Sequence, residues 1–67
     1  MFYTQHHNVI NNRSIWHYLI ETPIGQINIV QYEQPSLEIK RFLFDGHYDK
    51  AERKFYSICQ GILSGKL

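Results

Sequence analysis

Two runs of β-branched and aromatic residues in the first half of the chain predict an antiparallel hairpin. They cover residues 14–21 (SIWHYLIE) and 26–33 (QINIVQYE), and the four residues TPIG lie between them. The ring of Pro23 presets φ for the first central position of a type I turn, and Gly25 suits a left-handed position after it. The spacing and the turn residues therefore predict two strands joined by a tight loop.

The turn also predicts a register for this hairpin. A three-residue loop that ends at Gly25 pairs Thr22 with Gln26, so that Leu19 faces Ile29. Both faces then carry large apolar groups, and a slip of one residue would exchange them. The predicted sets are Ile15, Leu19, Ile27 and Ile29 on one face, and Trp16, Tyr18, Ile20, Val30 and Tyr32 on the other.

Residues 37–44 (LEIKRFLF) fit either a third strand or a short helix. As a helix the segment would be capped by Ser36, but its apolar stripe would be interrupted by Lys40 and Arg41. The ending FLF directly before Asp45-Gly46 is typical of a strand that enters a tight turn. We therefore favour the strand.

Residues 49–64 predict an amphipathic helix. One stripe at helical spacing is apolar, the opposite stripe is polar, and Gly65 is a suitable C-terminal stop. Asp49 stands just before the apolar run and Glu52 three residues later, which predicts an Asp version of the capping box. The apolar stripe consists of Ala51, Phe55, Ile58, Cys59 and Ile62.

Together these elements predict an α+β fold, with a three-stranded antiparallel meander (about 14–21, 26–33 and 37–44) and one C-terminal helix (about 49–64) on one face. Residues 1–13 are polar and rich in Asn. They predict a flexible N-terminal arm, or a short extra strand at Phe2–Thr4. The domain organisation is then an arm at 1–13 followed by a single βββα domain at 14–67.

Composition narrows the classes of function. The net charge is +1, from seven basic and six acidic residues, so a strong electrostatic attraction to nucleic acid or to an anionic membrane is absent. No apolar run approaches the roughly 20 residues that span a bilayer, and one cysteine allows no internal disulfide. These features predict a cytoplasmic protein that needs no cofactor and no membrane.

The stretch DGHYDKAE contains the residues that most resemble a catalytic or metal site. Asp45, His47 and Asp49 stand at alternate positions, yet a turn and a helix cap account for both acids. Neither the histidines nor Cys59 has the spacing of a metal motif, and a thiol on the apolar helix stripe is typical of a buried side chain. The sequence therefore predicts no catalytic residue, no metal ligand and no enzyme.

Aromatic residues give the functional prediction. If the helix packs on the aliphatic side of the sheet, the aromatic side faces outward and forms an interaction surface. This favours a small non-enzymatic interaction or regulatory accessory module, with a protein partner or a homo-oligomer. If the helix covers the aromatic side instead, the outer face keeps only scattered apolar residues. The predicted interaction residues are Trp16, Tyr18, Tyr32, Phe42 and Phe44.

The alternative is a nucleic-acid-binding module. The segment FLFDGHYDKAERKFYSI resembles the third strand and helix of sheet-plus-helix DNA-binding modules, such as AP2 domains and the N-terminal domains of some phage integrases, at Gly46, Tyr48, Ala51 and Phe55. The resemblance implies a sheet that enters a DNA groove with basic residues along its strands. The hairpin strands here carry no Lys or Arg. In this alternative the phosphate-contacting residues are Arg13, Lys40 and Arg41, and Trp16 or Tyr18 stacks on bases.

Overall fold

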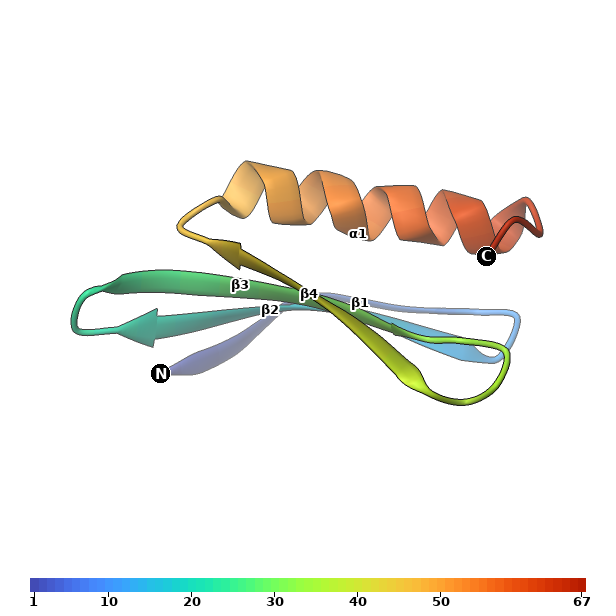
Figure 1. Cartoon of the computed structure of the whole chain (residues 1–67), viewed down its shortest axis with the longest axis horizontal. Coiled ribbons are helices and arrows are strands. Elements are labelled where there is room, and N and C mark those ends of the chain that lie inside the picture. Colours follow the sequence, from blue (N-terminus) through green and yellow to red (C-terminus); the bar gives the residue numbers. More distant parts are fainter.

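The computed structural model describes all 67 residues and contains one sheet and one helix in two layers (Figure 1). The strands follow one another across the sheet in the order β1-β2-β3-β4, and each pair is antiparallel. The helix lies along one face of the sheet, and the other face has no covering layer (Figure 1). The elements are β1 (Phe2–Ile10), β2 (Arg13–Thr22), β3 (Gly25–Glu33), β4 (Ile39–Asp45) and α1 (Tyr48–Leu63).

The predicted α+β class, the meander and the C-terminal helix are confirmed, but the sheet has four strands where the sequence predicts three. The ambiguous third segment is a strand, as favoured. The fourth strand is β1, in the segment that the sequence predicts as a flexible arm or a short strand at Phe2–Thr4. It extends from Phe2 to Ile10 and pairs with β2 on both sides of a bulge at Gln5. The helix α1 lacks the length and the apolar character that a bilayer crossing requires.

The turn between β1 and β2 explains how a polar segment becomes a strand. Ile10 pairs with Arg13, so the loop contains only Asn11 and Asn12. Both asparagines have positive φ, 53° and 60°, as a type I′ hairpin turn requires. Asparagine tolerates this conformation better than most residues, so the Asn-Asn pair is a local hairpin signal.

The predicted register of the second hairpin is wrong by one residue. Thr22 pairs with Gly25, so the loop consists of Pro23 and Ile24 alone, and Gly25 is the first residue of β3 with φ +148°. Leu19 consequently faces Asn28 and not Ile29. Because side chains alternate along a strand, the shift moves every β3 residue to the opposite face from the one predicted.

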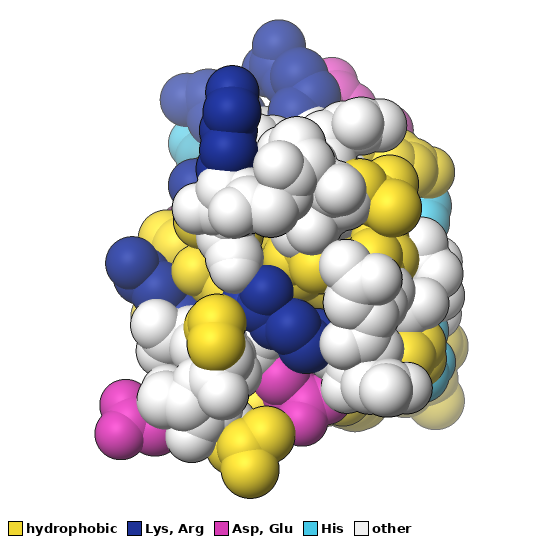
Figure 2. Space-filling model, turned by 90° about the vertical axis from the view of Figure 1, so that its right-hand side faces the viewer, with side chains coloured by type: hydrophobic (Ala, Val, Ile, Leu, Met, Phe, Trp, Pro, Cys, Tyr) yellow, Lys and Arg dark blue, Asp and Glu magenta, His cyan; other side chains and the backbone are white.

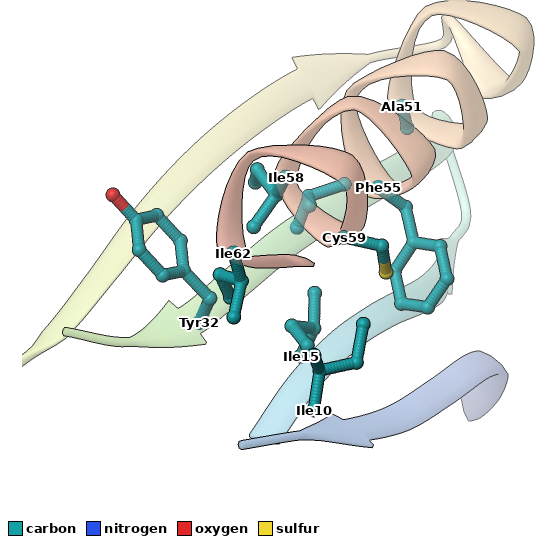
Figure 3. Close-up of a cluster of buried hydrophobic side chains, with 9 residues drawn as sticks. Ile10, Ile15, Tyr32, Ala51, Phe55, Ile58, Cys59 and Ile62 are labelled. Carbon is teal, nitrogen blue, oxygen red and sulfur yellow. The ribbon is translucent and has the colours of Figure 1, made fainter. Parts of the chain in front are cut away.

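The core lies between α1 and one face of the sheet (Figure 3). The apolar stripe of α1 that the sequence predicts is buried along its whole length. In Figure 3, Cys59 lies above Ile15 and Ile10 of the first two strands, and Ile62 lies beside Tyr32 of β3. Burial of apolar area at about 25 cal/mol per Å² is the main force that holds the two layers together.

The two ends of α1 differ in how well they are capped. At the C-terminus, Lys66 N–H donates to Gly61 O and Gly65 N–H donates to Ile62 O, with Gly65 at φ +78°, which is a Schellman motif. At the N-terminus the prediction of Asp49 as the cap is wrong. The cap position is His47, it makes no side-chain capping bond, and Asp49 lies in the first turn.

An acceptor at the uncapped N-terminus should stabilise the protein. His47→Asp supplies a carboxylate at the cap position, where it can accept from the free N–H groups of the first turn and where its charge suits the helix dipole. We expect the free energy of unfolding in urea to rise by about 1 kcal/mol. His47→Ala is the matched control and should change it little. A His47→Asp protein no more stable than His47→Ala would contradict the capping geometry.

Candidate interaction surface

The face of the sheet away from α1, called the open face below, is a continuous four-stranded surface. Residues paired across neighbouring strands share a face, so the registers determine its members. It carries Phe2, Thr4, His7 and Val9 from β1, Ser14, Trp16, Tyr18 and Ile20 from β2, Ile27, Ile29, Gln31 and Glu33 from β3, and Ile39, Arg41, Leu43 and Asp45 from β4.

Apolar side chains on the open face concentrate in two neighbouring rows across the strands. One row contains Tyr18, Ile29 and Leu43, and the next contains Phe2, Ile20 and Ile27. Phe2 is 58% exposed and Leu43 is 67% exposed, whereas the β2 and β3 members are half-buried. Water therefore contacts a large apolar area that no element of the chain covers, and such areas on small proteins are typical of interaction sites.

Aromatic contacts give this surface a defined shape. Trp16 stacks on His7 with ring centroids 5.5 Å apart and an interplanar angle of 2°. Tyr18 lies between Trp16, at 6.4 Å, and Phe2, at 4.8 Å. Burial among these rings raises the pKa of the Tyr18 hydroxyl. Rigid aromatic side chains of this kind bury large areas with little loss of entropy when a partner binds.

The structure divides the five aromatic residues of the sequence prediction between the two faces. Trp16 and Tyr18 lie on the open face, but Tyr32, Phe42 and Phe44 lie on the helix side and pack in or against the core. The physical reason is the one-residue register shift, which turns Tyr32 toward α1 and its β4 neighbours with it. The predicted surface of five aromatics therefore does not form.

The three basic residues of the nucleic-acid alternative are also divided. Arg41 lies on the open face, where its Nε donates to Gln31 Oε1 at 2.9 Å. Arg13 and Lys40 lie on the helix side. Arg13 donates to the backbone oxygens of Glu33 and Leu67, and Lys40 Nζ lies 5.6 Å from the centroid of the Phe42 ring. The three cations do not form one patch beside Trp16 and Tyr18.

The segment DGHYD does not form an acid–base cluster. His47 and Asp49 line a shallow hollow of about 350 Å³ at the start of α1, together with Lys50 and Arg53. Asp45 lines a separate hollow of about 420 Å³ beside the Pro23–Ile24 turn. The structure has no group of three or more His, Cys, Asp or Glu side chains that could hold a metal ion.

Beneath the first half of α1 lies a polar seam that the sequence did not predict, made of His6, His17, Asn28 and Glu52. His17 and Asn28 are fully buried, and the His17 Nε2 to Asn28 Oδ1 distance is 2.9 Å. With the amide oxygen as the acceptor, Nε2 carries the proton and donates. His17 Nδ1 and Asn28 Nδ2 have no hydrogen-bond partner. Burial, opposed in part by the Asn28 bond, lowers the pKa of His17 from its ordinary 6.5.

A β-bulge brings His6 into this seam. The pairing of β1 with β2 shifts between Thr4 and His6, and the extra residue, Gln5, accepts a hydrogen bond from the Tyr48 hydroxyl. His6 therefore faces α1, where its Nε2 lies 3.1 Å from Glu52 Oε2 and its ring stacks on His17 at 5.3 Å. A bulge of this kind re-aims a side chain that strict alternation would place on the other face.

Cys59 lies on the buried stripe of α1, as the sequence predicts. Burial raises the pKa of its thiol, against a weaker opposing effect of a hydrogen bond from Asn8. A thiol in this environment remains protonated near neutral pH and is a poor nucleophile.

Comparison with known proteins adds no family to this description. Neither a protein-family model, nor a curated protein sequence, nor a solved structure matches the chain. The open face and the polar seam are therefore the features of the molecule that bear on function.

The buried histidine predicts a pH-dependent stability. The pKa of His17 in the folded state lies below 6.5. Its contribution to the free energy of unfolding is therefore fully present above about pH 6.5. As the pH falls below that value, the unfolded chain takes up a proton that the folded state excludes. We expect the free energy of unfolding in urea to fall between about pH 7 and about pH 5, with a slope of at most about 1.4 kcal/mol per pH unit from this residue.

His17→Gln removes the titrating ring and should flatten this pH dependence, at the cost of a lower stability at neutral pH. His47→Gln removes an imidazole from the exposed start of α1 and controls for the loss of a histidine as such. The contrary outcome is a pH dependence of the free energy of unfolding that is the same in His17→Gln as in the wild type and changes only in His47→Gln. That result would show that the polar seam does not cause the acid sensitivity.

Proposed function

We propose that this protein is a small non-enzymatic interaction module that binds a protein through the open face of its sheet. One observation carries the proposal. The only helix covers one side of the sheet, and the side without a covering layer carries the rings of Trp16 and Tyr18 beside the exposed side chains of Phe2 and Leu43. Aromatic residues next to aliphatic ones are the typical anchors of protein interfaces.

Charge on the open face favours a protein over a nucleic acid as the partner. Arg41 is its only Lys or Arg, and Glu33 and Asp45 lie on the same face. A surface with more carboxylates than fixed cations repels a phosphate backbone, which needs several cations for affinity at physiological salt. The nucleic-acid alternative therefore has less support than the protein partner.

The chemistry of the buried groups supports a role without catalysis. Cys59 and His17 are both buried. Burial raises the pKa of the Cys59 thiol and lowers the pKa of His17, and both shifts favour the neutral form of the side chain. The His6–Glu52 pair is part-exposed at the edge of α1, but neither hollow on the surface includes it. A general base needs a substrate position within hydrogen-bond reach, and no concave site adjoins this pair.

Site-specific photo-crosslinking tests the proposal because it captures whichever protein lies against a chosen position. A photoreactive phenylalanine derivative at position 43 presents a probe on the open face. The same group at position 56 presents it on α1, where Tyr56 is 53% exposed. In cells of the source organism we expect discrete protein adducts from position 43 and few from position 56. Equal labelling from both positions, or none from position 43, would overturn the proposal.

A further inference from the structure

We infer that the partner of the open face is a second copy of this chain, packed sheet on sheet about a two-fold axis that runs across the strands through Tyr18, Ile29 and Leu43. The inference deepens the proposed function and rests on it, because it names the occupant of the same surface. The pattern of charges and apolar rows along the strands supports it.

Charge positions on β4 select this axis. Arg41, Leu43 and Asp45 are successive open-face residues of the strand. The proposed axis lies along the row of Tyr18, Ile29 and Leu43 and reverses the direction of each strand. A residue two positions before this row in one copy therefore lies opposite the residue two positions after it in the same strand of the other copy. Arg41 of each copy therefore meets Asp45 of the other copy, and the dimer contains this complementary pair twice.

The guanidinium of Arg41 is already oriented for such a contact. Its Nε donates to Gln31 Oε1 at 2.9 Å on the same chain, which holds the side chain along the sheet surface. An arginine has five N–H donors, so the terminal nitrogens remain for a carboxylate. Within one copy no carboxylate lies within ion-pair distance of Arg41, because the only ion pair in the protein is His6–Glu52.

The same axis places the apolar rows together. Tyr18, Ile29 and Leu43 each meet their own counterparts, and Trp16 of one copy lies opposite Ile20 of the other. Positions beyond Arg41, including Glu33, fall toward the ends of the contact. The apolar centre and polar ends reproduce the usual anatomy of a protein interface.

The size of the face agrees with a small dimer interface. The molecule is 39 Å long and 15 Å across in the direction viewed in Figure 1, which is the direction across the strands. The footprint is on the order of 600 Å² per copy, close to the roughly 800 Å² of a standard interface. An interface of this size is large enough for a specific dimer, and its affinity depends on the contacts within it more than on its area.

The edges of the sheet and the outer surface of the helix are poorer candidates for self-association. The edge strand β1 contains the bulge at Gln5, and the edge strand β4 carries Lys40 and Arg41, and both features oppose pairing with another strand. Viewed end-on with the helix uppermost, several Lys and Arg side chains lie together at the top over α1, and others lie lower on this end of the molecule (Figure 2). Two copies of that surface would repel each other.

Sedimentation velocity over a range from low to hundreds of micromolar tests the inference. The wild type should change from monomer to dimer as its concentration rises. Arg41→Asp and Asp45→Arg should each raise the dissociation constant at least about tenfold, because each places like charges opposite each other at both contacts. The double variant restores opposite charges and should return to within about threefold of the wild type.

Lys40→Glu is the matched control, because Lys40 adjoins Arg41 in β4 but faces α1. It should not weaken the dimer. A second variant, Leu43→Lys, removes the central apolar contact without the charge pair and should leave a monomer. Circular dichroism verifies that each variant is folded.

A wild type that stays monomeric throughout would overturn the second copy as the partner. A double variant that dissociates as readily as the single variants would overturn the proposed axis. Either result would leave the proposed interaction module intact. In that case the photo-crosslinking experiment should still give adducts between position 43 and a different protein.

Discussion

One amphipathic helix has to cover a four-stranded sheet, and it can do so on one side only. A helix of 16 residues is about 24 Å long and about 10 Å wide, so it shields the middle of one face. The buried stripe from Ala51 to Ile62 meets Ile15 and Val30 on that side, and this contact forms nearly all of the core. The open face follows from the same constraint, because the chain has no second helix to cover it.

The contact between the layers is not purely apolar, and its polar part lies under the half of the helix that has the weaker cap. His17 and Asn28 occupy core positions where Leu or Val would bury the same area without unmet hydrogen bonds. His6 and Glu52 join them across the helix–sheet boundary. The first half of α1 should therefore separate from the sheet more readily than the second half, where Ile58, Ile62 and the Schellman motif hold it.

The sequence predicts the elements better than it predicts the faces. The hairpin and the helix have strong local signals, the strand that ends at Asp45 has a weaker one in its FLF ending, and all three are present. The register between β2 and β3 has no such local signal. Both faces of β3 carry apolar residues, so a shift of one residue costs little apolar burial. Gly25 fits a longer loop as well as it fits the two-residue loop that forms.

Two other features were missed, one in spite of a local signal and one because it depends on contacts between distant segments. Strand β1 is polar, and its position follows from pairing with β2 and from the Asn11–Asn12 turn, which is a readable signal in the sequence. The helix begins at Tyr48 and not after Asp49. The Tyr48 ring packs 5.0 Å from the His17 ring and its hydroxyl donates to Gln5, so these contacts outweigh the local capping preference.

The most direct test of the open face as a buried interface uses the single tryptophan, Trp16, which lies on that face. Its fluorescence emission and its quenching by acrylamide should be measured while the protein is diluted from hundreds of micromolar to below one micromolar. We expect an emission shift to longer wavelength and a rise in quenching on dilution, as the indole passes from an interface into water. Emission and quenching that stay constant over the whole range would contradict a buried interface at this face.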